Sequence, residues 1–368
     1  LDEPAAATLT EALAGQPFTV SAVDQRPSTR RPAAPFMTST LQQEAGRRLR
    51  WTAKRVMDVA QRLYEGGYIT YMRTDSTTLS DQAIAAARSQ AQDLYGADHV
   101  PAAPRRYDRK VKNAQEAHEA IRPSGDHFRT PGQVSGTISR DEFLLYELIW
   151  KRTLASQMAD AKVATTTLRL GATASDGRQV EFTASGTVVV FPGFLAAYAD
   201  VTDDGDAKKA DTRLPGVVQG DTVTPTELVA EPHSTNPPPR YTEGSLTKKL
   251  EEMGIGRPST FATIANTLID REYVWRRGSA LVPTFLGMTV VRLLEDHFTA
   301  LVDYSFTAQM EEVLDAIAAG DDSRLQALER FYRGDGGFDG LRNLIDKGGD
   351  DIDARALSTF AIAGSDAA

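Results

Sequence analysis

The stretch Gly66-Gly67-Tyr68-Ile69-Thr70-Tyr71-Met72-Arg73-Thr74-Asp75-Ser76 decides how the rest of the chain is interpreted. Upstream of it, Val56, Val59, Ala60 and Leu63 recur at helical spacing, and the two glycines predict the end of that helix. The aromatic and β-branched side chains that follow favour a short extended segment. The sequence therefore places a tyrosine and an arginine two residues apart, where an extended segment turns polar.

A tyrosine near an arginine suits phosphoryl transfer. The tyrosine hydroxyl is a weak nucleophile unless a cation steadies the phosphate and the developing phenolate. Arg73 is permanently charged and can hold two phosphate oxygens at once. The spacing alone also describes a buried tyrosine beside a surface arginine, which is the commoner arrangement.

The nine residues 68–76 resemble the active-site signature of bacterial type IA DNA topoisomerases, the omega-protein family, in its actinobacterial form. The resemblance implies that Tyr71 is the nucleophile, which attacks DNA and carries a covalent 5′-phosphate. It also implies that Arg73 is the phosphate-binding partner of Tyr71. Thr70 and Asp75 are DNA-binding residues on the same grounds.

Composition limits the remaining possibilities. With 368 residues, 41% of them hydrophobic and 25% charged, the chain fits two to four globular domains. It has no cysteine, its five histidines show no metal-ligand spacing, and no signal peptide or membrane-length apolar run is apparent. We expect a cytoplasmic, nucleoid-associated protein with no membrane partner, and the initial Leu1 suggests an excised fragment.

The net charge of −9 argues against a nucleic-acid binder when it is read globally. Basic residues nevertheless cluster before the tyrosine motif, in residues 47–55, and after it, in residues 105–112. A basic groove on an acidic body is one interpretation, and an ordinary solvated face is the other.

Periodicity divides the chain into four parts. Residues 1–37 and 155–235 contain Thr- and Val-rich strand patterns and are predicted to form one discontinuous β-rich domain. Residues 38–154 read as a helical domain that carries Tyr71, with capping-box spacing at Ser39/Gln42, Asn113/Glu116 and Ser139/Glu142. Residues 236–332 read as helix, turn, helix and hairpin, which is a winged-helix-like pattern. Residues 333–368 are predicted to be a linker and the start of a truncated C-terminal domain.

Two further strings resemble the same family. The first is residues 113–123, where His118 and Arg122 are spaced to share a helix face; a lone helical histidine is usually structural, but the resemblance implies that His118 binds DNA phosphate. The second comprises residues 239–243 and 254–260, and here the resemblance implies that Arg257, Ser259 and Thr260 contact single-stranded DNA, as does Arg271. An ordinary helix cap is the local alternative, although a helix N-terminus also favours phosphate.

The resemblance covers roughly residues 15–330 and implies a multidomain α+β fold, the toroid-forming type IA core. It implies ATP-independent cleavage of one strand, strand passage and religation, which relaxes negatively supercoiled DNA. The family's N-terminal metal-binding (Toprim) module, with its Mg²⁺-binding acidic residues, has no counterpart here. The implied partners are therefore single-stranded and negatively supercoiled DNA and the absent Toprim and C-terminal modules. We expect Mg²⁺ only in the full-length enzyme and none bound by this chain, which alone is predicted to be inactive.

Two other classes stay open. A tyrosine recombinase also uses Tyr, Arg and His, but its tyrosine lies downstream of the other two, whereas Tyr71 precedes His118 and Arg122. A non-enzymatic winged-helix DNA-binding protein would account for residues 240–285 and leave the Tyr71 string unexplained.

Overall fold

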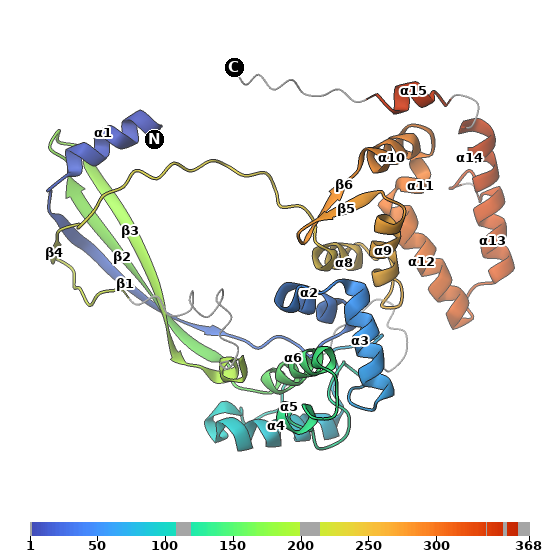
Figure 1. The fold of residues 1–368 in the computed structure, drawn as a ribbon, viewed down its shortest axis with the longest axis horizontal. Helices are drawn as coiled ribbons and strands as arrows, with labels where there is room; N and C mark the ends of the chain where they lie inside the picture. Colours follow the sequence, from blue (N-terminus) through green and yellow to red (C-terminus); the bar gives the residue numbers. More distant parts are fainter. Residues whose placement is uncertain (1, 108–118, 199–213, 336, 349–351, 360–368) are drawn as a thin grey trace. The chain divides into compact units, whose positions relative to one another are not determined.

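A computed structural model describes residues 2–107, 119–198, 214–335, 337–348 and 352–359 (Figure 1). These residues form two compact units. Unit 1 comprises residues 1–33, 84–105 and 151–238, and unit 2 comprises residues 34–83, 106–150 and 239–368. Two of the boundaries fall inside helices, α4 (Asp81–Tyr95) and α6 (Arg140–Ser156).

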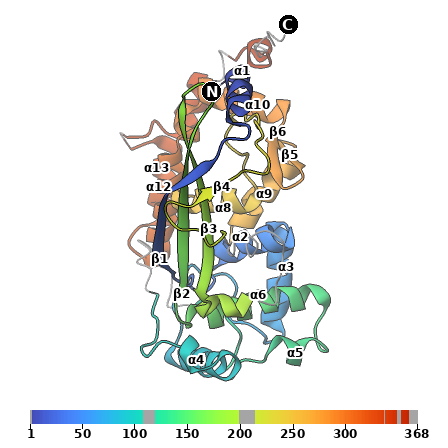
Figure 2. The same cartoon turned by 90° about the vertical axis from the view of Figure 1, so that its left-hand side faces the viewer.

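Unit 1 is built on an antiparallel sheet with the strand order β3-β2-β1-β4. Its long strands lie side by side in Figures 1 and 2, and their bounds are β1 Phe18–Arg30, β2 Ala161–Thr173 and β3 Gln179–Phe191, with a short β4 Thr222–Val223. Threonines and valines fill these strands, and the pair Thr165 and Thr187 joins hydroxyls across β2 and β3 at 3.0 Å. The predicted pairing of the strand near residue 20 with the later strands is confirmed.

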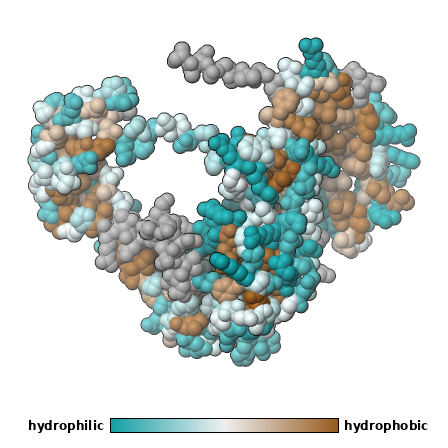
Figure 3. All heavy atoms as spheres, in the orientation of Figure 1, coloured by the Kyte–Doolittle hydropathy of each residue, from teal (hydrophilic) through white to brown (hydrophobic). Residues whose placement is uncertain are grey.

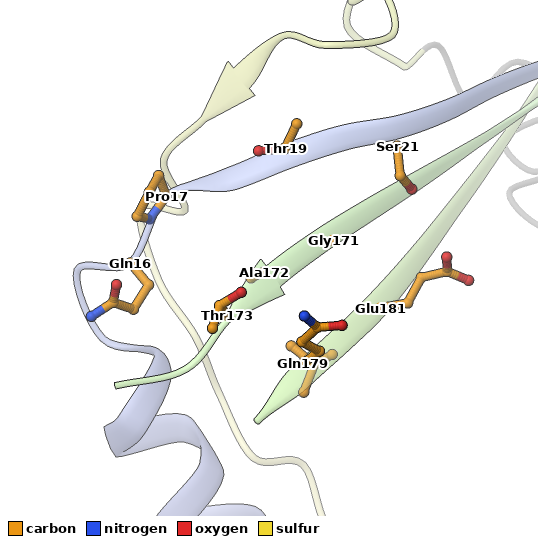
Figure 4. A pocket seen from close by; sticks show the side chains of 10 residues that line it. Gln16, Pro17, Thr19, Ser21, Gly171, Ala172, Thr173, Gln179 and Glu181 are labelled. Atoms are coloured by element: carbon orange, nitrogen blue, oxygen red, sulfur yellow. The ribbon is translucent and has the colours of Figure 1, made fainter. Parts of the chain in front are cut away.

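The core of unit 1 is small. Helix α1 (Glu3–Leu13) covers one end of the sheet, where Leu13 and Phe18 are buried with Ala172. An open hollow lies beside it on the sheet, lined by polar side chains that include Thr19, Thr173 and Gln179 (Figure 4). Two short 3-10 helices complete the unit: η1 Ala97–His99 and η2 Gly193–Tyr198.

Unit 2 holds the tyrosine segment. Its first part comprises α2 Thr38–Leu49, α3 Ala53–Glu65 and α5 Pro131–Val134, with the residues of α4 and α6 that belong to this unit. The predicted capping box at Ser139 and Glu142 is confirmed, since each backbone N–H bonds the other side chain, at 2.8 and 3.4 Å. The box at Asn113 and Glu116 lies outside the described residues.

The predicted helix, turn, helix and hairpin also occur in unit 2. They are α8 Glu243–Glu252, α9 Phe261–Asp270, β5 Val274–Arg277 and β6 Ala280–Pro283. Thr242 caps α8 with a hydrogen bond from Ser245 N–H, as expected from the sequence. Helix α2 packs against α8, and α3 packs against α9. This α2–α8 contact joins the tyrosine-bearing helices to the helix-hairpin element.

The last part of unit 2 is helical: α10 Phe285–His297, α11 Thr299–Val302, α12 Tyr304–Ala319, α13 Arg324–Arg333, α14 Leu341–Gly348 and α15 Ala354–Leu357. Large apolar side chains are exposed along these helices, including Val291, Leu314 and Leu325, and Figure 3 shows brown surface over them.

The α+β fold class predicted from the sequence is confirmed. The division into four domains, and the winged-helix interpretation within it, stay predictions. No helix among the described residues is long and apolar enough to cross a membrane.

Candidate active site around Tyr71

Helix α3 leads into the tyrosine segment and ends where the sequence predicted. Val56, Val59, Ala60 and Leu63 are all at most 1% exposed, so the helical spacing marks its core face. The helix ends at Glu65, and the N–H of Tyr68 bonds back to the carbonyl of Leu63 at 2.8 Å. The last turn of α3 is therefore fixed directly before the tyrosine segment.

Tyr71 is half-buried and packs against a second tyrosine, Tyr64 on α3. Their ring centroids are 5.3 Å apart with an interplanar angle of 68°, an edge-to-face contact. Tyr64 is 41% exposed. We missed it in the sequence, although its position in the last helical turn before the motif was a signal that it would lie near Tyr71.

The expected extended segment at residues 68–71 is reduced to a single isolated bridge between Ile69 and Pro123. The strand prediction was wrong here because the partner segment touches at one point only. Thr70 supplies the main anchor instead: its hydroxyl donates to the carbonyl of Ala120 at 2.7 Å and accepts from Arg122 N–H at 3.0 Å. Thr70 thus has a structural task, and its DNA contact stays a prediction.

A second anchor follows Tyr71 and comes from Thr38, the first residue of α2. The Thr38 hydroxyl lies 2.7 Å from the carbonyl oxygen of Met72 and 3.0 Å from that of Thr74. It accepts the Thr74 N–H at 2.9 Å, and its own backbone N–H donates to the Thr74 carbonyl at 2.9 Å. Thr38, Met72 and Thr74 are all at most 2% exposed.

Arg73 lies between these anchored residues and is itself exposed. Its guanidinium has no hydrogen bond or ion pair with any residue that the structure describes. Asp75 is half-buried and likewise has no side-chain partner within the described part of the chain. The segment therefore carries a half-buried tyrosine and an exposed arginine that has no ion pair within the described residues. Hydrogen bonds hold its backbone on both sides of Tyr71.

Most other basic residues near the motif are already paired. Arg47 and Arg48 both bind Glu44, at 3.0 and 2.6 Å. Burial raises the pKa of Glu44, but the hydrogen bonds from the two arginines outweigh it and lower this pKa to about 2. Lys54 and Arg55 pair with carboxylates as well. The basic cluster before the motif is thus partly neutralised within the fold.

The segment after residue 118 differs from the predicted helix. His118 lies outside the described residues, so its proposed phosphate contact is untested. Arg122 is not helical: its chain lies between two isolated bridges, and its guanidinium binds Glu119 at 2.6 Å and the carbonyls of Pro123 and Gly125. The shared helix face was wrong because these side-chain and backbone bonds hold the segment extended. Burial raises the pKa of Glu119, and bonds from Ser80 and Arg122 lower it to below its usual value.

Ser39 and Gln42 do not form the predicted capping box, because the N-cap of α2 is Met37, two residues before Ser39, and the helix begins at Thr38. Both side chains face α8 instead. The Ser39 hydroxyl donates to Glu251 at 2.9 Å, and Gln42 Oε1 accepts from Thr247 at 3.4 Å. Gln42 is 2% exposed, and its Nε2 finds no acceptor among the described residues.

Glu243 adds a second polar link between the same elements. Its carboxylate accepts the Ala53 N–H at the start of α3, at 2.8 Å, and binds Arg276 on β5 at 2.5 Å. Glu243 itself is buried, at 8% exposed, whereas the side chain of Arg276 is 38% exposed. Glu243 lies in the string 239–243 that resembles the family, but no spacing predicted these bonds, because their partners lie far away in the chain.

The second group of predicted DNA contacts surrounds the start of α9. Arg257 is engaged in the fold: its guanidinium binds Asp315 at 2.6 Å and lies 3.9 Å from Glu311. The Thr260 hydroxyl accepts the Arg257 N–H at 2.8 Å, which closes the turn before the helix. Ser259 and Arg271 are exposed, at opposite ends of this short helix. Their role as DNA contacts is untested.

The described residues do not fit a metal site. Within them, no group of three histidine, aspartate or glutamate side chains lies close enough to hold an ion. Asp351 and Asp353 are separated by one residue, and Asp353 caps α15 through hydrogen bonds from the N–H groups of Arg355 and Ala356. Asp351 lies outside the described residues.

Comparison with known proteins bears on this geometry. The family described as DNA topoisomerase matches residues 1–329. The chain is 55% identical to DNA topoisomerase 1 of Mycolicibacterium smegmatis and 53% identical to that of Streptomyces coelicolor, over 98% of this chain in both cases. It spans about 40% of the length of each of these relatives. Its fold matches a full-length topoisomerase I from Thermotoga maritima with a TM-score of 0.74 at 33% identity, over 96% of this chain and 55% of that one.

Proposed function

Because the chain belongs to the DNA topoisomerase family, we propose that it is the tyrosine-bearing part of a type IA enzyme that relaxes negatively supercoiled DNA without ATP. The chain spans about 40% of its curated relatives, so the complete activity belongs to the longer protein. The observation that carries the proposal is a half-buried Tyr71 two residues before an exposed Arg73, on a backbone anchored at both sides.

The proposed chemistry is a transesterification. The Tyr71 hydroxyl oxygen forms a bond to a phosphorus atom of single-stranded DNA, and the bond from that phosphorus to the 3′-oxygen breaks. The leaving 3′-oxygen takes up a proton, and the 5′-phosphate stays on Tyr71. After another strand has passed, the 3′-hydroxyl attacks the phosphotyrosine and restores both the DNA and the phenol.

Arg73 has the right chemistry to assist this step. Its guanidinium is exposed and has no partner within the described residues, so it binds phosphate without first breaking an ion pair. A fixed positive charge beside the phosphate stabilises the charge that develops on it. Arg271 and Ser259, both exposed, are proposed to hold the flanking single strand, together with Thr260, Asp75, Thr70 and His118.

Arg257 is a weaker candidate for a direct contact, because Asp315 and Glu311 already neutralise it. We assign the Mg²⁺ requirement that the family resemblance implies to the part of the longer relatives that this chain does not cover, since the described residues hold no suitable group of ligands. No step above passes through a metal ion.

The test is covalent trapping in the full-length protein that carries this sequence. A single-stranded oligonucleotide is labelled at one end, and the reaction is stopped with denaturant. Tyr71→Phe should abolish the adduct and leave DNA affinity within about two-fold, because only the nucleophilic oxygen is lost. Tyr68→Phe is the matched control: Tyr68 lies in the same segment and bonds Thr137 at 3.2 Å, so its variant should form adduct normally.

The labelled end identifies the class of enzyme. A 5′-phosphotyrosine keeps the 3′-labelled fragment on the protein and releases the 5′-labelled one. The opposite result would indicate a tyrosine recombinase, and DNA binding with no adduct would indicate a binding protein. The isolated chain should bind DNA and fail to relax a supercoiled plasmid, even with Mg²⁺.

A further inference from the structure

We propose that Thr38 is a positioning residue for Tyr71 and Arg73, and that it ties their position to the docking of α8 on α2. The inference rests on the proposed function, since it gives Thr38 a task only if Tyr71 reacts. Thr38 lies outside the nine-residue motif, and nothing in the motif itself identifies it.

The hydroxyl of Thr38 is the centre of several hydrogen bonds to the tyrosine segment. Three hydrogen-bonding groups of residues 72 and 74 converge on its hydroxyl: two carbonyl oxygens at 2.7 and 3.0 Å and one N–H at 2.9 Å. The hydroxyl has one hydrogen, so it serves the two carbonyls alternately while it accepts the N–H. Thr38 is 0% exposed, so water cannot replace it.

Regular secondary structure does not support the backbone around Arg73. Residues 70–80 form neither helix nor strand, so no ladder of backbone bonds fixes them. Thr70 holds the backbone before Tyr71, and Thr38 holds it on both sides of Arg73. Loss of the Thr38 hydroxyl therefore removes the bond to the Met72 carbonyl, and Thr38 then holds Thr74 through its backbone N–H alone. A displacement of about 1 Å at a reacting group costs about 100-fold in rate.

Thr38 lies in the first turn of α2, whose other side chains contact α8. The next residue, Ser39, and Gln42 one turn on both bind α8. Gly244 of α8 comes so close that an added Cβ would lie 3.1 Å from the Cα of Gln43. The first turn of α2 is thus held by α8 on one side and holds the tyrosine segment on the other. A shift of α8 that moves this turn also moves the backbone of residues 72 and 74.

The test uses the full-length protein and the rate of covalent adduct formation in a single turnover. Thr38→Val keeps the shape of the side chain and removes the hydroxyl. We expect the rate per folded molecule to fall at least about 10-fold, with DNA affinity within about two-fold of wild type. Thr38→Ser restores the hydroxyl and should recover most of the rate.

Thr77→Val is the matched control. Thr77 is also buried, and its hydroxyl also donates to a backbone carbonyl, but the acceptor is Tyr107, at 3.1 Å, and not a residue of the segment 71–74. A purely structural role would lower the melting temperature of both variants alike and leave both rates per folded molecule unchanged. If Thr38→Val fails to fold, Thr38→Cys takes its place, because a thiol bonds more weakly in nearly the same volume.

The outcomes separate the two proposals. Adduct formation by wild type and by Thr38→Val at equal rates, with none by Tyr71→Phe, would overturn the positioning role alone. Adduct formation by Tyr71→Phe at the wild-type rate would overturn the proposed function itself. A slow Thr38→Val that Thr38→Ser does not rescue would also reject the role of the hydroxyl.

Discussion

Tyr64 and Tyr71 form an edge-to-face pair with ring centroids 5.3 Å apart, which places the last turn of α3 directly against the proposed nucleophile. Tyr71 lies in a segment without regular structure, whereas Tyr64 belongs to a helix with a fully buried face. The contact therefore packs Tyr71 against a helix whose opposite face lies in the core. Such pairs contribute about 0.5–1.5 kcal/mol beyond their buried area.

Tyr64→Ala should therefore slow covalent adduct formation by about 3- to 10-fold, since the ring contact that orients Tyr71, worth about 1 kcal/mol, is lost. Tyr64→Phe keeps the ring and should react at nearly the wild-type rate. The measurement is single-turnover cleavage of a single-stranded oligonucleotide by the full-length protein, with DNA affinity determined separately. Equal rates for the alanine and phenylalanine variants would show that the ring contact does not orient Tyr71.

Alanine substitutions at Arg73 and at Arg257 should affect different properties, DNA binding in the first case and stability in the second. Arg73 is exposed and unpaired among the described residues, so Arg73→Ala should weaken binding of all single strands and reduce the salt slope by about 0.7. Arg257 forms an ion pair with Asp315, so Arg257→Ala should mainly destabilise the fold, by about 1–3 kcal/mol.

Salt titrations of DNA binding and thermal unfolding of both variants make this comparison. A salt slope that falls equally for both would show that Arg257 leaves Asp315 to bind phosphate, as the family resemblance implies. An unchanged slope for Arg73→Ala would remove Arg73 from the phosphate site.

Local signals predicted the local structure well. The helical spacing before Gly66 and the capping box at Ser139 and Glu142 depend on neighbours within four residues, and both are confirmed. The pattern at Ser39 and Gln42 has the same spacing and was misread, because its partners are on α8, about 200 residues away.

The hydrogen bonds that anchor the site could not be predicted from the sequence, for the same reason. Thr38 lies 34 and 36 residues before the carbonyls that it holds, and a threonine at a helix start reads as an ordinary cap. The motif identified Tyr71 and Arg73 by resemblance, but it gave no information on what fixes their backbone. Bonds to Glu119 and to backbone carbonyls likewise overrode the helix expected at Arg122.

Glu44 provides a prediction about pH. Its pKa in the fold is about 2, below the ordinary 4.5, so its bonds to Arg47 and Arg48 stabilise the fold fully above pH 4.5. This contribution is lost as the pH falls from 4.5 towards 2. It amounts to about 1–2 kcal/mol, because Arg47 is half-exposed and solvent screens the pair.

Glu44→Gln should therefore lower the free energy of unfolding at pH 7, and this decrease should be smallest at low pH. Urea unfolding of both proteins at pH 7, 5 and 3 measures the difference, which should shrink at the lowest pH. A difference that is the same at all three values would show that the carboxylate charge does not contribute.

The contact between α2 and α8 can be opened from the α8 side at Gly244. An added Cβ there would lie 3.1 Å from the Cα of Gln43, so Gly244→Val forces the two helices apart and should cost about 1–3 kcal/mol of stability. Gly136→Val is the control in the same unit, because no atom lies within 4 Å of its added Cβ.

Thermal unfolding and amide hydrogen exchange of the two variants test the contact between α2 and α8. We expect faster exchange in α2, α8 and residues 72–74 for Gly244→Val only, since Thr38 joins α2 to that segment. Faster exchange in α8 with residues 72–74 unchanged would show that α8 and the tyrosine segment are not coupled through α2.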